Sequence, residues 1–137
     1  MKKKLLVLLT TVVMMLSLVA CGSKVTTLED YYMRPAYKAA LDQEIETIKA
    51  QYADAYSDIT FEVKGNTFSY IYTYAVQIDD VETAKQTLAA SFTDETMAPL
   101  AASLEEEAGV KGITVEYIFL NNDGSNIHTA SYTTAAE

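Results

Sequence analysis

The sequence has one cysteine, one histidine, two prolines and no tryptophan among its 137 residues. A single cysteine excludes an internal disulfide, and one histidine among scattered acids does not match the common zinc spacings. Basic residues are also scarce, with 10 Lys and Arg against 19 Asp and Glu and a formal net charge of −9. Because nucleic-acid binding needs clustered cations that contact phosphates, no nucleic-acid partner is expected.

The first twenty residues are typical of an export signal rather than of a folded domain. Three lysines at positions 2–4 precede an apolar run from Leu5 to Ala20. Sixteen helical residues span about 24 Å, whereas the hydrocarbon core of a bilayer is roughly 30 Å thick. The run therefore fits a signal peptide, residues 1–20, better than a permanent membrane helix. Its removal takes away three basic residues and no acid, which leaves 7 basic and 19 acidic residues and a net charge of −12.

The apolar run ends in Leu18-Val19-Ala20-Cys21, and Gly22-Ser23 follow. This segment resembles the lipobox of bacterial lipoproteins, whose processing enzymes attach diacylglycerol to the cysteine and cleave just before it. The resemblance implies that Cys21 is lipidated and that the bilayer is a partner of the mature protein. Two fatty chains anchor a protein stably, whereas one does so only marginally. A plain secretory signal is the alternative, but it leaves an exposed thiol at position 21 without a role.

The rest of the chain is long enough for one domain and too short for two. We expect a tether over residues 21–26, a single domain over 27–134 and a frayed tail over 135–137. Two overlapping cap signals at Thr26 and Thr27 predict a helical turn, and Pro35 fits the first position of a longer helix. That helix is indicated by apolar residues at spacings of three and four: Tyr37, Leu41, Ile45, Ile48 and Tyr52.

Two hairpins follow from alternating apolar residues on either side of turn residues. The first joins residues 59–63 to 67–74 through Gly65-Asn66, which places Val63 opposite Phe68 and Phe61 opposite Tyr70. The second joins 113–120 to 127–133 with Asp123-Gly124 as its turn. Its register places Val115 opposite Tyr132, Tyr117 opposite Ala130 and Phe119 opposite His128.

Helical patterns lie between the two hairpins. Asp79-Asp80 gives an acidic start to a stripe over residues 81–92. Thr96 can cap a second segment with Pro99 in its first turn, so we expect two helices or one kinked helix ending before Gly109. The order α-β-β-α-β-β predicts an α+β, two-layer sandwich in which helices cover one face of a four-stranded antiparallel sheet.

Few residues point to catalysis. His128 lacks a neighbouring nucleophile and orienting acid, so we expect it to be a structural residue of the hairpin, opposite Phe119 or near solvent. Asp79, Asp80 and Glu82 are better explained by helix capping than by metal binding. Glu105-Glu106-Glu107 covers a broad helical arc and reads as a solvated face. No cofactor, metal or catalytic set is expected.

The loop Asn121-Asn122-Asp123-Gly124-Ser125-Asn126 has some features of a calcium loop. Its glycine is fourth rather than sixth, however, and Tyr132 stands at the twelfth position, where a bidentate glutamate belongs. A turn is the better interpretation of this segment.

Ten tyrosines are the most unusual feature of the composition. Tyr70, Tyr72 and Tyr74 share one strand face, which favours a packed core if helices cover it and an aromatic binding platform if they do not. Tyr31, Tyr32 and Tyr56 lie at the ends of predicted elements. They are the candidate residues of an exposed contact surface.

The whole chain resembles small, uncharacterised lipoproteins of Gram-positive bacteria that carry a domain of unknown function after a lipobox. The resemblance rests on Cys21-Gly22-Ser23, Thr27-Leu28-Glu29-Asp30-Tyr31, Gly65-Asn66, Tyr70-x-Tyr72-x-Tyr74 and Leu120-Asn121-Asn122-Asp123-Gly124. The resemblance implies an extracytoplasmic location and a probable fold, but no site beyond Cys21, because that family has no assigned activity.

The main functional hypothesis is a non-enzymatic binding or accessory module that engages a protein, peptide or envelope polymer. One form of it is a regulator of an envelope enzyme that adds a partner strand to an exposed sheet edge. The alternatives are a carboxylate-dependent hydrolase of envelope material and a structural spacer.

Overall fold

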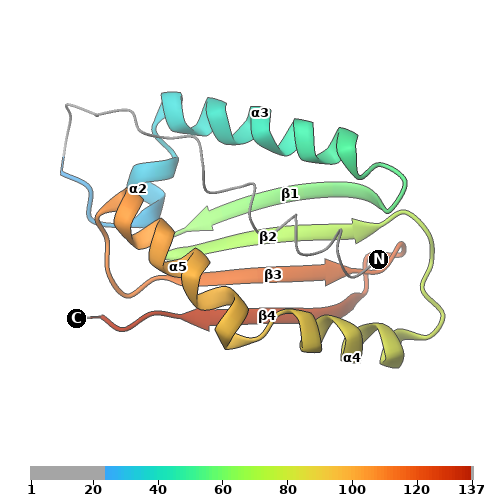
Figure 1. The fold of residues 1–137 in the computed structure, drawn as a ribbon. Helices are drawn as coiled ribbons and strands as arrows, with labels where there is room; N and C mark the ends of the chain where they lie inside the picture. Colours follow the sequence, from blue (N-terminus) through green and yellow to red (C-terminus); the bar gives the residue numbers. More distant parts are fainter. Residues whose placement is uncertain (1–23, 137) are drawn as a thin grey trace.

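The structure is a computed structural model that describes residues 24–136 (Figure 1). Its helices and strands are α2 (Leu28–Tyr32), α3 (Pro35–Gln51), β1 (Tyr56–Lys64), β2 (Thr67–Tyr74), α4 (Val81–Ser91), α5 (Asp94–Ala108), β3 (Thr114–Leu120) and β4 (Asn126–Thr133). The predicted signal peptide and Cys21 lie outside the described residues.

The two N-terminal helices form as the sequence predicts. Thr27 accepts a hydrogen bond from the Asp30 amide and completes a capping box for α2. Pro35 occupies the start of α3, where its missing N–H costs nothing. The predicted apolar stripe of α3 faces the protein interior: Tyr37, Leu41, Ile45 and Ile48 are buried, and Tyr52 packs against them.

The β1–β2 hairpin has the predicted register. Val63 pairs with Phe68, Phe61 with Tyr70, and the antiparallel ladder continues to Tyr56 opposite Tyr74, with an irregularity near Asp58. Gly65 adopts a φ of +58°, the sign that a II′ turn needs at its first central position.

The helical segment between the hairpins differs from the prediction in one respect. Asp80 caps α4 by accepting a hydrogen bond from the Thr83 amide. The cap of α5 is Thr93, not Thr96 as predicted, because Thr96 is the third helical residue and closes a capping box with Thr93. Pro99 therefore lies inside α5 rather than in its first turn. The helix ends at Ala108, before Gly109 as predicted, and Gly109 caps it with a left-handed φ of +69°.

The sheet is mixed, so the prediction of a fully antiparallel sheet is wrong. The strand order is β1-β2-β3-β4, and the central pair β2–β3 is parallel, with Tyr70 opposite Tyr117. The reason is the long connection through α4 and α5, which carries the chain back along the sheet before β3 begins. The β3–β4 register is as predicted, with Phe119 opposite His128.

The core lies between one face of this sheet and the helices. Side chains of β2 and β3 on that face are buried, among them Phe68, Tyr70, Tyr72, Val115, Tyr117 and Phe119. Residues on the other face, such as Ile71 and Ile118, stay partly exposed. Figure 1 shows α3 running along β1, α4 lying beside β4, and α5 crossing obliquely from β4 over β3 toward α2. The described chain therefore forms two layers, a sheet and the helices that cover one of its faces.

Candidate functional site

The three tyrosines predicted to form an exposed surface are buried instead. Tyr31 and Tyr56 are each 7 % exposed and Tyr32 is 1 % exposed. Tyr56, at the start of β1, packs against Tyr72 with ring centroids 5.2 Å apart. Tyr31 and Tyr32 are buried because α2 folds onto the first hairpin, where the Glu29 amide donates to the Gly65 carbonyl at 3.0 Å. Consequently the Tyr32 ring packs edge-on against Phe68, with centroids 5.1 Å apart.

The strand tyrosines belong to the core rather than to a binding platform. Tyr70 and Tyr117 stack across the parallel pair with ring centroids 5.0 Å apart, and Tyr72 stacks on Phe119 at 5.2 Å. Phe92, which follows α4, covers Tyr117 at 4.9 Å. Burial raises the pKa values of Tyr70, Tyr72 and Tyr117, so these phenols stay neutral.

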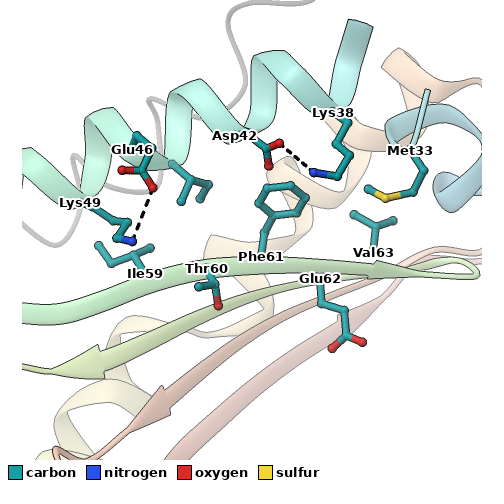
Figure 2. A pocket seen from close by; sticks show the side chains of 11 residues that line it. Met33, Lys38, Asp42, Glu46, Lys49, Ile59, Thr60, Phe61, Glu62 and Val63 are labelled. Carbon is teal, nitrogen blue, oxygen red and sulfur yellow. Dashed lines mark hydrogen bonds and ion pairs between the residues drawn. The ribbon is translucent and has the colours of Figure 1, made fainter. Parts of the chain in front are cut away.

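A groove of about 450 Å³ runs between α3 and the edge strand β1. It is lined from the helix side by Lys38, Asp42, Ile45, Glu46 and Lys49, from the strand side by Ile59, Thr60, Phe61, Glu62 and Val63, and at one end by Met33. Figure 2 shows Phe61 standing between the strand and the helix, with Ile59 and Val63 on either side of it. The floor is apolar and the rim is charged.

The outer edge of β1 has backbone N–H and C=O groups that form no hydrogen bonds within the sheet. A two-residue hairpin is closed by a hydrogen-bonded pair, here Lys64 and Thr67, and the bonded pairs then alternate along the ladder. The backbone N–H and C=O of Ile59, Phe61 and Val63 therefore point away from β2. Among the contacts within residues 24–136, none of these groups has a hydrogen-bond partner on that side.

The charges on the groove rim are paired with one another. Lys38 Nζ lies 2.7 Å from Asp42 Oδ2, and Lys49 Nζ lies 3.1 Å from Asp58 Oδ1 and 3.5 Å from Glu46 Oε1 (Figure 2 draws the two pairs within α3). Such exposed pairs contribute little to stability. Two lysines face three carboxylates in these pairs, so the rim keeps a net negative charge above an apolar floor.

The glutamates at the end of α5 do not form the solvated face that the sequence predicts. Glu105 is 9 % exposed, and its Oε2 accepts hydrogen bonds from the Gly112 amide at 3.1 Å and from the Thr134 hydroxyl at 2.8 Å. Lys111 lies 3.6 Å from its other oxygen. Glu106 is exposed, whereas Glu107 is partly buried and accepts a hydrogen bond from the Tyr32 hydroxyl at 3.2 Å.

Glu107 forms a second carboxylate site together with Glu44 of α3, which sequence reasoning missed. Oε1 of Glu107 is buried and has no hydrogen-bond partner within the described chain. Burial, followed by the like charge of Glu107, raises the pKa of Glu44 to about 7. Burial also raises the pKa of Glu107, against hydrogen bonds from Tyr32 and Tyr31 that lower it.

A small hollow lies beneath α3 beside Glu44. Its walls are Leu41, Glu44, Ile45, Ile48, Phe61, Phe68 and Tyr70. Two of these residues, Ile45 and Phe61, also line the groove. The hollow and the groove are thus neighbours, and the Phe61 ring and the Ile45 side chain lie between them.

The remaining candidates have structural roles. The side chain of Asn121 is fully buried and pins the segment before α4, because Oδ1 accepts from the Ile78 amide at 2.8 Å and Nδ2 donates to the Ile78 carbonyl at 2.9 Å. Asp123 accepts from the Ser125 amide, so this loop is a turn, as predicted. His128 is partly exposed, and burial lowers its pKa. Within residues 24–136, no three side chains of the metal-binding types converge.

Comparison with known proteins identifies the family. The chain belongs to the family described as Domain of unknown function (DUF4854), whose model matches residues 28–132 and so spans all the described helices and strands except the last residue of β4. No curated protein matches the chain, and no solved structure does. No helix within residues 24–136 is long and apolar enough to cross a bilayer.

Proposed function

We propose that this protein is an extracytoplasmic binding module, held at the membrane by lipid on Cys21, that binds an extended segment of a partner protein along β1. The observation that carries the proposal is the β1 edge itself, where unpaired backbone groups of Ile59, Phe61 and Val63 border a groove roofed by α3. Strand addition uses such an edge: the backbone supplies affinity, and pockets for alternate side chains supply specificity.

The shape of the groove favours a single strand over a second copy of this chain. Because α3 lies beside the β1 edge and forms one wall of the groove, a second copy pairing through its own β1 would bring its own α3 to the same place. A peptide segment in extended conformation has no such helix. It can place every second side chain on the floor formed by Ile59, Phe61 and Val63.

Selection of peptides from a random heptapeptide display library against the full-length chain in detergent micelles tests strand addition. We expect the selected peptides to slow hydrogen exchange at the amides of Ile59, Phe61 and Val63, with no change at the exposed helix α4. Recovery of no peptide, or protection elsewhere only, contradicts the proposal.

A matched pair of variants sharpens this test. Phe61→Ala removes the ring and keeps the backbone N–H, whereas Phe61→Pro removes both. Loss of one backbone hydrogen bond corresponds to an additional weakening of roughly tenfold in Kd for the proline variant. Equal affinities for the two variants would show that the peptide does not use this amide.

The membrane anchor is tested separately. Labelled palmitate is expected to enter the wild-type chain in a bacterial host and not the Cys21→Ala variant, which is expected to leave the membrane fraction. A Cys21→Ala chain that stays firmly with the membranes would contradict the anchor.

A second candidate function rests on the Glu44–Glu107 pair, since a carboxylate-dependent hydrolase needs one carboxyl group with a raised pKa, here Glu44, as the acid and a second, ionised carboxylate near it. Release of reducing sugars from purified cell-wall polymer by the wild-type chain, abolished in Glu44→Gln, would support this function. The absence of any release would exclude it for that polymer.

A further inference from the structure

We infer that the segment bound along β1 places a lysine or arginine opposite Glu62, between two apolar residues that enter the groove. This inference rests on the proposed strand addition and names the chemistry of the bound segment. It is carried by the alternation of the β1 side chains between two faces and by the charges on each face.

Strand addition at β1 gives the bound segment two different faces. The backbone groups of Phe61 and Val63 point out of the edge, so the added strand bonds to them and its side chains alternate as those of β1 do. Side chains on the face of Phe61 enter the groove between β1 and α3. Figure 2 shows Glu62 on the opposite side of β1 from α3. The residue beside Glu62 therefore lies outside the groove, and its two neighbours in sequence face into it.

The groove face of the bound segment meets an apolar floor with room for side chains. Ile59 is 1 % exposed and Val63 7 %, whereas Phe61 is partly exposed. The groove has a volume of about 450 Å³, within the usual range for a ligand pocket. Apolar side chains on either side of the position opposite Glu62 therefore bury against Phe61 and Val63.

The carboxylate of Glu62 has no partner of opposite charge in the described chain. None of the ion pairs within residues 24–136 includes it, although Lys64 lies two residues along on the same face. On its inner side Glu62 pairs with Ser69 of β2, whose hydroxyl donates to Glu116 Oε2 of β3 at 3.0 Å. The next charge in that direction is thus another carboxylate. The side of Glu62 that is left for a cation is the open edge of the sheet, where an added strand would lie.

The pairing geometry makes this position sensitive to charge. Because the outward backbone groups belong to Phe61 and Val63, Glu62 occupies a non-hydrogen-bonded position toward an antiparallel neighbour. Residues opposite each other at such positions have Cα atoms about 4.5 Å apart, closer than in a hydrogen-bonded pair, and opposite charges there attract each other. The groove rim adds to this preference, since two lysines face three carboxylates on it. Both faces of the edge thus favour a basic segment over an acidic one.

The test uses the peptides recovered from the heptapeptide library with the full-length chain. We expect a lysine or arginine with an apolar residue immediately before and immediately after it. Replacement of the basic residue by norleucine is expected to weaken binding by about two- to fivefold, the range for an exposed charge pair, and replacement by glutamate to weaken it further. The difference between the basic and the norleucine peptide should disappear at high salt, because salt screens exposed charges.

Glu62→Lys and Glu82→Lys form the matched pair of variants. Both change the net charge equally at exposed positions, but Glu82 lies on α4, which packs against β4 at the far edge of the sheet. Glu62→Lys is expected to reverse the preference, so that the glutamate peptide binds more tightly than the basic one. Glu82→Lys is expected to keep the wild-type order. Binding of the glutamate peptide also shows that the Glu62→Lys chain is folded.

Two results would overturn the inference: selected peptides without a basic residue between apolar ones, or an order of affinities that Glu62→Lys leaves unchanged. Strand addition would still stand if those peptides protect the amides of Ile59, Phe61 and Val63 from hydrogen exchange. Recovery of no peptide, or protection elsewhere only, would overturn both.

Discussion

The described chain contains two units of the same order, α2-α3-β1-β2 and α4-α5-β3-β4, each with one helix more than the predicted α-β-β, and the units differ at one strand edge. In the second unit, β3 is covered on its outer side by β2, which pairs with it from Thr67–Thr114 to Thr73–Leu120. In the first unit, the corresponding side of β1 has no strand beside it. The fold therefore already contains, at β3, the kind of strand addition that we propose at β1.

The helices of the two units also differ in how they pack on the sheet. α5 packs on both β3 and β4, and the loop after it is tied to the end of β4 through Glu105. α3 packs chiefly on β1, where it forms one wall of the groove. β4 is an edge strand too, as β1 is, but Glu105 ties the residue after β4 to the loop after α5, whereas a groove separates β1 from α3. In this sense we call the second unit closed and the first open.

Proline placed at an inner and at an outer strand position gives the largest expected contrast. Ile71 of β2 lies between Thr60 and Ile118, so Ile71→Pro removes a ladder hydrogen bond in the middle of the sheet. We expect a loss of about 3 kcal/mol or more in the free energy of unfolding, measured by urea denaturation. Phe61→Pro should cost little more than Phe61→Ala, because the amide of Phe61 points away from β2. Equal destabilisation by the two proline variants would show that β1 has no free edge.

Removal of the Glu105 carboxylate tests whether the second unit is held closed. Glu105→Ala leaves the Gly112 amide and the Thr134 hydroxyl without their partner, which costs about 1–3 kcal/mol in unfolding free energy. Glu106→Ala is the matched control, since Glu106 is exposed and its loss should change stability by less than about 0.5 kcal/mol. Hydrogen exchange should speed up at Ile113 and Thr134 in the first variant alone. An unchanged exchange rate at Ile113 and Thr134 would show that the Glu105 hydrogen bonds do not hold this segment in place.

Local structure was predictable from the sequence because side-chain period and turn residues act over short distances. Val63, Phe68 and the Gly65-Asn66 turn determine the first hairpin together, since a one-residue slip would expose every buried residue. The parallel pairing of β2 with β3 was not predictable in this way. It depends on where the chain returns to the sheet after α4 and α5. The side-chain pattern within a strand does not indicate the direction of its neighbour.

The candidate site was harder to predict than the fold because it depends on burial between distant segments. Leu28, Tyr31 and Tyr32 recur at the spacing of one helix face, a signal of burial that outweighs their position at the end of an element. Glu105 likewise follows the buried Ala101 by four residues and precedes the buried Ala108 by three. Its burial beside the apolar stripe of α5 was therefore predictable from this spacing. No comparable signal marks Glu44, whose pKa is raised by burial and then by the charge of Glu107, more than sixty residues away.

The pH dependence of stability gives the smallest expected effect and tests the contact between the two units, where Glu44 of α3 lies near Glu107 of α5. The pKa of Glu44 is raised to about 7 in the folded state, so the folded protein binds more protons than the unfolded chain between pH 4.5 and 7. The stability associated with protonated Glu44 is therefore lost as the pH rises through this window. The lowered pKa of His128 acts in the opposite direction, because the folded protein binds fewer protons at that group.

The difference between wild type and Glu44→Gln isolates the contribution of Glu44, since His128 is common to both chains. At pH 8 we expect Glu44→Gln to be more stable by roughly 1 kcal/mol, a value reduced from the full shift because the carboxyl is partly exposed. At pH 3 this difference should have disappeared, because the carboxyl is then neutral in both the folded and the unfolded state. Glu46→Gln, the exposed neighbour on α3, should show no such pH-dependent difference. If Glu44→Gln is no more stable than wild type at pH 8, water screens the repulsion between Glu44 and Glu107, and the pair does not destabilise the folded protein.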